Sequence, residues 1–476
     1  MLPAVRYTGP ATMPSLLASA AVDISSSTET LGSFVSDGGV LGQDFTAFIV
    51  APPSSNIYSV RFNSSLGSNI SWSYPVSYSY YTAAVMGPRA VYVTSGLANE
   101  GYTALNKSTG EVFWSANFTF LDTRLVGTRL LGYVPAARLG HGPTPSVGAD
   151  KQRRVQSTQT TTNTRTSAAT QTVTASFNAV VNNVYCGKET LLFQPLITSA
   201  GLIIQCTLRC ILGINSTNGR LVWYRIIGNG PNFSINVGNF GSVSFTSSLV
   251  LSKNESIFCG GTSTGSAFCS WTADGSLIWT TKISTDAGGL TTMPLIHNDT
   301  LFVRFKTCMS GLANNYGHCV SAFTLSGIQL WNTSLLSKSP AFYMTNNPIS
   351  VLPSFISPTV DALVMTARLS TKLSVLVFNP VNASLLRTIS LPCAGGSSSA
   401  SSVIAVDASN ALFIMCVDGS SFLQTLYRIN ATTGTITYSL PLDDASYVSS
   451  PNYLSLVVGS CALLISDQSG RLFVYR

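Results

Sequence analysis

Residues able to do chemistry are few in this 476-residue chain. None of the three histidines (His141, His297 and His318) stands at metal-ligand spacing from another His, Cys or carboxylate. Most of the 19 acidic residues fall in expected turns, and turn formation accounts for them. The chain also has no Gly-x-Ser-x-Gly elbow and no phosphate-binding loop. We therefore expect no catalytic, cofactor-binding or metal-binding residue.

The ten cysteines allow redox chemistry of another kind, namely disulfide formation. Three pairs stand at the spacing of cross-strand bonds that close hairpins: Cys206 with Cys210, Cys259 with Cys269, and Cys308 with Cys319. Such bonds indicate an oxidising compartment. The alternative is a reduced protein in which the cysteines are small buried hydrophobic residues. Four cysteines have no evident partner: Cys186, Cys393, Cys416 and Cys461.

Asn-x-Ser/Thr sequons are a second feature of secreted proteins, and the chain has eleven. Six at expected turns or strand ends are candidate N-glycosylation sites: Asn106, Asn215, Asn254, Asn298, Asn332 and Asn430. The competing explanation is that a turn of the type Asn-x-x-Thr-Gly creates sequons as a by-product.

The elements that carry these residues are short strands joined by a repeated turn. ALNKSTGEVFW (104–114) reads as a strand end, a tight turn and a new strand. Asn106 can bond its own backbone, and Gly110 tolerates a positive φ. Close copies are INSTNGRLVW (214–223) and INATTGTITY (429–438), and looser ones end at Trp72, Trp279, Trp331 and Arg387. Strand-only repeats about 40–56 residues apart favour a propeller.

The pattern Asn106…Thr109-Gly110…Trp114 resembles the tryptophan-docking repeat of pyrroloquinoline quinone (PQQ)-like, quinoprotein alcohol dehydrogenase-like β-propellers. The resemblance covers nearly the whole chain outside 121–185 and implies the fold. It assigns structural repeat positions to Trp72, Trp114, Trp223, Trp279, Trp331, Gly110, Gly219 and Gly434. The chain departs from it with Asn in place of Asp in the turn, and with Arg387 and Tyr438 in place of Trp.

The same resemblance implies an enzyme alternative, a PQQ-dependent dehydrogenase. That chemistry needs a metal held by acidic and amide side chains, a carboxylate base and, usually, adjacent cysteines. The chain has no Cys-Cys pair and few acidic residues outside turns. We therefore expect no cofactor, and the missing site residues argue against an enzyme.

The repeats predict an all-β, eight-bladed propeller, with seven blades as the alternative. Residues 1–30 supply a closing strand, because the eighth unit stops at Arg476 without its fourth strand. Blades one and two occupy 31–120 and blades three to eight 186–476. Between them lies a basic, Thr-rich insertion, 121–185, which we interpret as a loosely docked loop unless the gene model retains an intron.

Composition limits the classes of partner. Charged residues are 9% of the chain, and five of the seven net positive charges fall in 121–170. No basic stripe with aromatic residues predicts nucleic-acid binding, and no apolar run is long enough for a membrane span. We expect a non-catalytic scaffold in the secretory pathway or outside the cell, without an evident signal peptide, that binds a protein through its loops. A membrane-protein assembly scaffold is the other alternative, and the sequence leaves oligomeric state and partner identity open.

Overall fold

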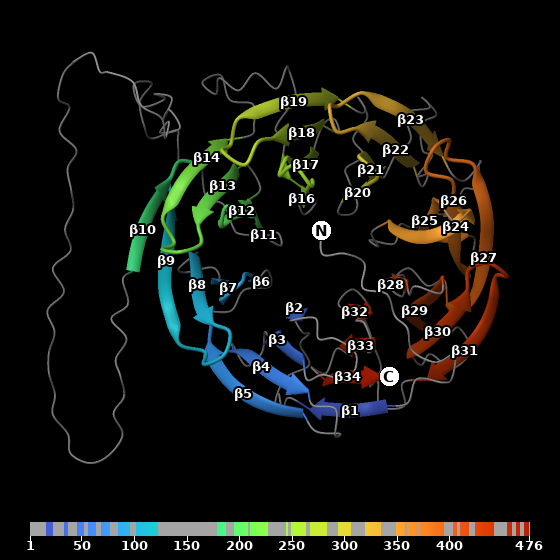
Figure 1. Ribbon diagram of the computed structural model, residues 1–476, viewed down its shortest axis with the longest axis horizontal. Coiled ribbons are helices and arrows are strands. Elements are labelled where there is room, and N and C mark those ends of the chain that lie inside the picture. Colours follow the sequence, from blue (N-terminus) through green and yellow to red (C-terminus); the bar gives the residue numbers. More distant parts are fainter. Residues whose placement is uncertain are drawn as a thin grey trace, which may run out of the picture.

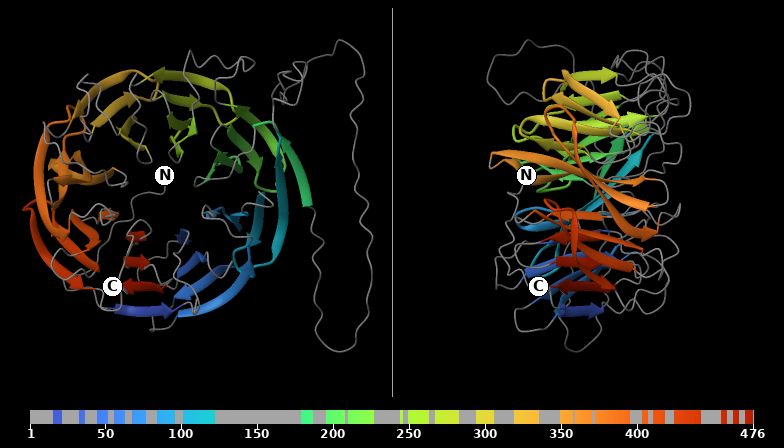
Figure 2. Two further views of the ribbon diagram at one scale, coloured as in Figure 1. Left: turned by 180° about the vertical axis from the view of Figure 1, so that it is seen from behind. Right: turned by 90° about the vertical axis from the view of Figure 1, so that its right-hand side faces the viewer.

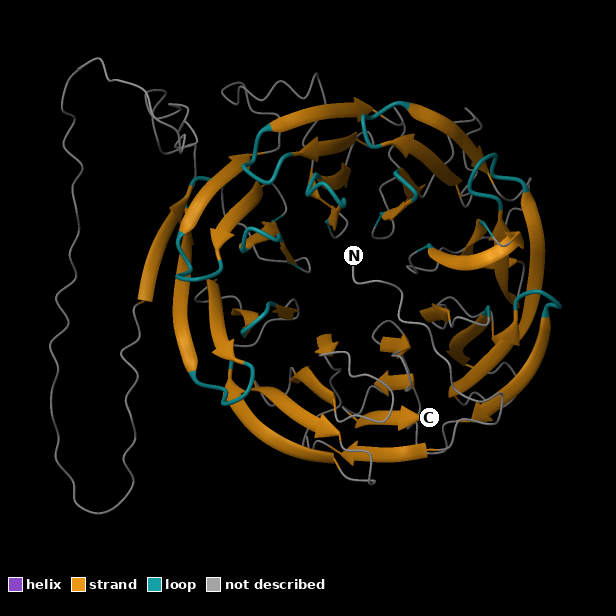
Figure 3. Ribbon diagram, viewed as in Figure 1, coloured by secondary structure: helices purple, strands orange, loops and turns teal. Residues whose placement is uncertain are grey.

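The computed structural model of the chain is a ring of small sheets, and every regular element in its described residues is a strand (Figures 1 and 3). The all-β class is therefore confirmed. The described residues are 16–21, 33–36, 45–51, 56–62, 68–76, 84–95, 101–121, 179–186, 195–207, 210–226, 244–245, 249–262, 267–282, 294–305, 319–334, 349–357, 359–369, 372–394, 403–406, 410–417, 424–441, 455–458, 463–466 and 471–475.

The strand sequences explain their places in the sheets. β26 (Lys372–Phe378) reads KLSVLVF and is buried at every residue after Lys372, as expected of a strand covered on both faces. β9 (Val112–Phe120) instead buries alternate residues, Trp114, Ala116 and Phe118. Third strands such as β26 therefore lie inside their sheets, and fourth strands such as β9 lie towards the rim of the ring (Figure 1).

The described strands form eight sheets, which we number as blades in chain order. Blade one contains β2 (Ser33–Ser36), β3 (Phe45–Ala51), β4 (Asn56–Phe62) and β5 (Ser68–Pro75). Blade two contains β6 (Ala84–Met86), β7 (Ala90–Ser95), β8 (Gly101–Asn106), β9 and β10 (Ala179–Val184). Blade three contains β11 (Leu196–Ile197), β12 (Leu202–Cys206), β13 (Cys210–Asn215) and β14 (Leu221–Ile226). Blade four contains β15 (Ser244–Phe245), β16 (Val250–Leu251), β17 (Ile257–Thr262), β18 (Ala267–Trp271) and β19 (Leu277–Lys282).

The remaining blades follow the same order from the centre to the rim (Figure 1). Blade five contains β20 (Leu295–His297), β21 (Thr300–Phe305), β22 (Cys319–Thr324) and β23 (Gln329–Ser334). Blade six contains β24 (Ser350–Ser357), β25 (Val360–Leu369), β26 and β27 (Leu385–Ala394). Blade seven contains β28 (Val403–Val406), β29 (Ala411–Val417), β30 (Gln424–Asn430) and β31 (Thr435–Pro441). Blade eight contains β32 (Ser455–Val458), β33 (Leu463–Ser466), β34 (Arg471–Tyr475) and β1 (Leu16–Ala21).

Blade eight combines the two ends of the described chain. β1 lies antiparallel to β34, with Ala18 opposite Val474 and Ala21 opposite Arg471. Figure 1 shows β1 at the rim beside β34, between blades seven and one. The N-terminal strand β1 thus takes the fourth, outermost place in the sheet of β32, β33 and β34.

Blade two departs from the antiparallel pattern expected of every sheet. β10 pairs with the outer edge of β9 in a parallel register, with Ala179 opposite Ser115 and Val184 opposite Phe120. The last residues of the 121–185 segment therefore form a regular strand and belong to the propeller. Val180 to Val184 fit this place because they are mostly β-branched, and Val181 is 62% exposed.

The strands run between the two faces of the ring (Figure 2). We call one of them the turn face, because it carries the tight turns between third and fourth strands, such as Asn106–Gly110 and Asn215–Gly219. The turns between first and second strands lie there too, since the amide of Ser216 bonds the carbonyl of Gly201. The opposite face, where the fourth strands end, is the loop face.

Candidate functional site

The repeated tryptophans join each blade to the turn of the next. Their indole Nε1–H groups donate to a backbone carbonyl at the same turn position in the following blade, at 2.8–3.0 Å. The donor and acceptor residues are Trp72 and Lys107, Trp114 and Ser216, Trp223 and Ala273, Trp279 and Leu325, and Trp331 and Pro380. Each acceptor directly follows the first residue of its turn, so five blade interfaces share one hydrogen bond.

The side chain of the first residue of each turn stabilises the turn conformation that presents the carbonyl to the indole. Asn106 Oδ1 accepts the backbone N–H of Ser108 at 2.8 Å, and Asn215 and Asn430 accept in the same way. Thr272 and Thr324 use their hydroxyls instead, each accepting a backbone N–H at 3.0 Å. At the first turn position, Asn and Thr thus both supply a side-chain acceptor for a backbone N–H of the turn, although the sequence pattern contained Asn or Asp.

The glycine that ends the turn lies directly under the neighbouring indole. Gly110, Gly219 and Gly434 all have positive φ. A Cβ on Gly219 would lie 2.5 Å from the Trp114 ring, and one on Gly110 would lie 2.7 Å from the Trp72 ring. Gly434 instead faces Arg387, which stands where other blades have Trp. Glycine is therefore required at Gly110 and Gly219 both for the backbone conformation and for the close approach of the ring.

A small residue opposite each tryptophan is a part of the repeat that the sequence interpretation missed. The residues paired with the five tryptophans on the third strands are Ser59, Ala104, Gly213, Ser270 and Ala322. Where Arg387 and Tyr438 replace Trp, the paired residues are Val377 and Arg428. A small residue nine to thirteen positions before each Trp was therefore a signal in the sequence. In blade three the Trp223 ring lies against Gly213 on its own third strand.

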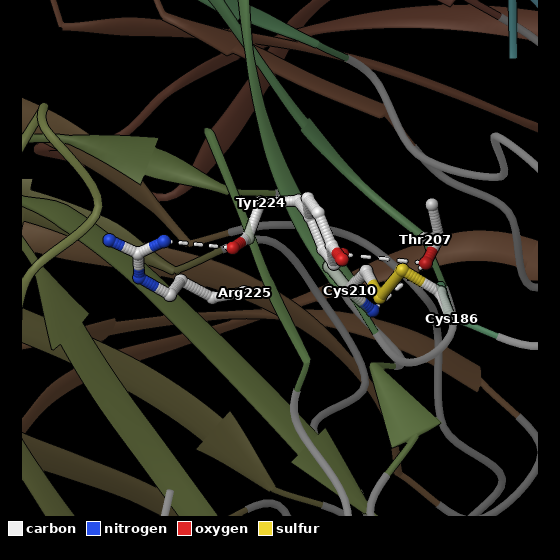
Figure 4. Close-up of a disulfide and its surroundings, with 5 residues drawn as sticks. All are labelled: Cys186, Thr207, Cys210, Tyr224 and Arg225. Atoms are coloured by element: carbon white, nitrogen blue, oxygen red, sulfur yellow. Dashed lines mark hydrogen bonds between the residues drawn. A yellow bond between two sulfur atoms is a disulfide. The ribbon is translucent and has the colours of Figure 1, made fainter. Parts of the chain in front are cut away.

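Blades two and three are also joined by a disulfide between Cys186 and Cys210, with Cα atoms 6.1 Å apart (Figure 4). This corrects the expected pairing of Cys206 with Cys210. Cys206 lies opposite Ile211, so the next residue back, Cys210, points to the other side of the sheet. Cys206 accordingly packs with Trp223 and Trp271, and Cys210 with Ala116 and Phe118.

The other cysteines expected to pair are described only in part. Cys259 and Cys269 are directly opposite each other on β17 and β18, at the register that a cross-strand disulfide needs. Cys319 begins β22, whereas Cys308 lies outside the described residues. The pairs 259–269 and 308–319 therefore stay predictions.

The disulfide lies at the loop face, next to the places where two long segments begin. β9 ends at Phe120 and β14 ends at Ile226, and both strands start at turns joined by the Trp114–Ser216 bond. Their far ends therefore lie together on the loop face. Arg225, whose guanidinium carbon is 5.8 Å from the Trp223 ring centre, and Tyr224 stand beside them (Figure 4). The bulk of 121–185 and residues 227–241 lie outside the described residues.

Titratable side chains are dispersed among the blades. His297 Nε2 is 2.8 Å from Asp361 Oδ2, a contact between blades five and six, while His141 and His318 lie outside the described residues. Arg304 on β21 is fully buried, and its guanidinium donates to the Thr366 carbonyl. Burial lowers the pKa of Arg304 to about 10, so the guanidinium is still charged at neutral pH. In the part of the chain that the structure describes, no three His, Cys, Asp or Glu side chains gather as metal ligands do.

The candidate glycosylation sites lie towards the turn face. Asn106, Asn215 and Asn430 begin turns between third and fourth strands. Asn254 and Asn298 stand in turns between first and second strands, where both side chains are exposed. Asn332 is the exception, because it lies in the middle of β23, after Trp331, and is half-buried.

The family model described as outer membrane protein assembly factor BamB matches residues 208–476, more than half of the chain. The chain belongs to this family. No curated protein matches its sequence. Within the described residues, no helix is of the length and apolarity that a membrane crossing requires.

Solved structures show how widely this architecture occurs. BamB from Moraxella catarrhalis superposes with a TM-score of 0.54 at 12% identity, over 98% of each chain. The C-terminal WD40 domain of Sif2 gives 0.52 at 9% identity, over 98% of this chain and 99% of that one. Quinohemoprotein alcohol dehydrogenase from Comamonas testosteroni gives 0.50 at 9% identity, over 83% of this chain and 73% of that one. At these identities the similarity to BamB and the others shows a propeller fold alone.

Proposed function

We propose that this BamB-family chain is a non-catalytic, secreted or cell-surface scaffold that binds a protein partner through its loop face. The observation that supports it best is where the two long segments that follow β9 and β14 begin. Both begin at the ends of fourth strands on the loop face, next to the Cys186–Cys210 disulfide. Long loops held by a braced scaffold are the usual carriers of binding.

The candidate glycans support the same assignment of faces. Five of the six candidate Asn residues belong to turns at the turn face, and the sixth, Asn332, lies within β23. Glycans there would shield one side of the ring and leave the loop face open to a partner. A secreted location accounts for the sequons and for the disulfide together.

Charge indicates the chemistry of the partner. Residues 121–170 contain seven basic and two acidic residues, a net charge of +5 on a segment that begins at the loop-face end of β9. An acidic protein surface would be steered to this segment and held there by contacts that salt weakens. Binding should therefore weaken as ionic strength rises.

Cross-linking of the native protein with a lysine-specific reagent, followed by mass spectrometry, tests which face binds. Lys372 is exposed in the hairpin between β25 and β26 on the loop face, and Lys253 is exposed on the turn face. We expect intermolecular cross-links at Lys372 and at Lys151 of the basic segment, and none at Lys253. Partner cross-links concentrated at Lys253 would overturn the proposal. Lys253→Arg and Lys372→Arg variants serve as matched controls for reagent specificity.

Assembly of membrane proteins is a second candidate function, favoured by the family match over 208–476. In that case the partner is a component or a client of membrane-protein assembly. Depleting the chain from its own cells should then lower the amount of correctly folded membrane proteins. If the membrane proteome is unchanged and the loop-face cross-links are still found, the role in membrane-protein assembly is excluded. The scaffold proposal would then still stand.

A further inference from the structure

We infer that Cys393 forms a disulfide with Cys416, which ties blade six to blade seven. Cys393 stands near the end of β27, is 3% exposed and is disulfide-bonded. Cys416 stands near the end of β29, the second strand of the next blade. Neither cysteine has a partner at hairpin spacing, so the bond must link separate elements.

The packing around Cys393 indicates which element supplies the partner. Cys393 belongs to an apolar cluster that includes Leu391 on its own strand and Leu412 and Ile414 on β29. Successive side chains on a strand alternate between its two faces. Cys416, two residues after Ile414, therefore has the same strand parity as the β29 residues that pack against β27.

The two cysteines also stand towards the same face of the ring. Arg387 lies against Gly434 in the turn of blade seven, and the carbonyl of Asn410 bonds the amide of Ala431 in the same turn. Cys393 comes six residues after Arg387, and Cys416 six residues after Asn410. Because β27 and β29 both run from the turn face towards the loop face, both cysteines come near the loop-face ends of their strands.

The Cys186–Cys210 bond joins two other blades in an equivalent way. It connects the rim of blade two to a buried strand of blade three, near the loop-face ends of both. A Cys393–Cys416 bond would do the same four blades further round the ring. Its formation removes two protons and two electrons from the two thiols. An acceptor disulfide of a thiol oxidoreductase takes them and is released as a dithiol.

Peptide mapping of the native, alkylated protein tests this pairing. Trypsin alone leaves both cysteines on residues 388–428, which contain no internal Lys or Arg. A second digestion before Asp407 and Asp418 separates residues 388–406 from 407–417, each with one cysteine. We expect these two peptides to be linked before reduction and separate after it. Cys393 linked to any other cysteine, or either thiol alkylated without reduction, would overturn the inference.

Variants provide a second, independent measurement. Cys393→Ser and Cys416→Ser should lower the melting temperature, and the double variant should lower it no further than the more destabilising single one. Cys186→Ser combined with Cys393→Ser should instead show additive losses, because these cysteines belong to separate interfaces. Additive losses for Cys393→Ser and Cys416→Ser would contradict the bond. If a variant fails to fold, the peptide map of the parent protein decides.

Discussion

At the scale of single residues, the residue type at the last position of each turn depends on the aromatic side chain that packs against it from the neighbouring blade. Blade six departs from the other blades, because Ala383 takes the place of Gly110 and Gly219. Its φ is +58° and its amide bonds the Asn379 carbonyl, as that of Gly110 bonds Asn106. Ala383 is buried in the cluster against which Trp331 packs, so this interface has adjusted to a methyl group.

Gly219→Ala and Ala383→Gly should therefore have very different effects on stability. Gly219→Ala should lower the free energy of unfolding by about 2–4 kcal/mol, from a strained backbone and from a clash with Trp114. Ala383→Gly should change it by less than about 1 kcal/mol, since relief of strain offsets the added freedom of the unfolded chain. Urea unfolding measures both.

Gly201→Ala is the control that separates strain from the clash. Gly201 also has positive φ, but a Cβ there would meet only Ser216 Oγ, at 3.1 Å. Gly201→Ala should lower the free energy of unfolding by about 1–2 kcal/mol. An equal loss for Gly201→Ala and Gly219→Ala would show that the indole contact contributes nothing.

A buried tyrosine predicts how stability changes at high pH. Tyr102 is fully buried, and its hydroxyl donates to Gln205 Oε1 across blades two and three. Burial raises the pKa of Tyr102 well above its usual value. Above about pH 10 the unfolded chain releases this proton and the folded chain keeps it, so stability falls as pH rises.

Tyr102→Phe should make that fall shallower. At neutral pH the variant should lose about 1–3 kcal/mol, because Gln205 Oε1 loses a buried donor. Urea unfolding at neutral pH and at roughly pH 9–11 gives both quantities. A variant with the same slope as the parent would show that Tyr102 ionises equally in both states.

At the scale of elements, prediction from sequence succeeds where the signal is local and fails where it is not. Turn residues and Trp114 lie within one hairpin, so their spacing is visible along the chain. The pairing of β10 with β9 joins residues more than sixty positions apart, and the Thr-rich run between them carries no strand pattern. The sequence shows no partner for Cys186, because only the pairing of β10 with β9 brings Cys186 close to Cys210.

The hairpin of β17 and β18 offers a test of the cysteine predictions at this scale. Cys259 and Cys269 are directly opposed, and opposed Cα atoms in such a ladder lie about 4.5–5.5 Å apart, within disulfide range. We expect the tryptic peptide 254–282 to lack two hydrogens until it is reduced. Alkylation of both thiols in the unreduced protein would contradict this pairing.

At the scale of the whole molecule, the pairing of β1 with β34 determines whether the ring is closed. Engineered disulfides at Ala18/Val474 and at Ser19/Phe473 test it, because neighbouring pairs alternate between the two cross-strand geometries. At least one pair of Cys substitutions should oxidise spontaneously and raise the free energy of unfolding by about 2–4 kcal/mol. Failure of both pairs to oxidise in the folded protein would count against closure by this strand.

The two unusual strands have a joint consequence for a chain that has been cut. A single proteolytic nick between residues 122 and 178 would yield two fragments, each holding a strand that belongs to the other's sheet. The first contributes β1 to the blade of β34, and the second contributes β10 to the blade of β9. The two fragments would therefore be held together by strand pairing at two places on the ring. The nicked protein should therefore remain one particle without a connecting peptide, and the halves, expressed separately, should complement each other.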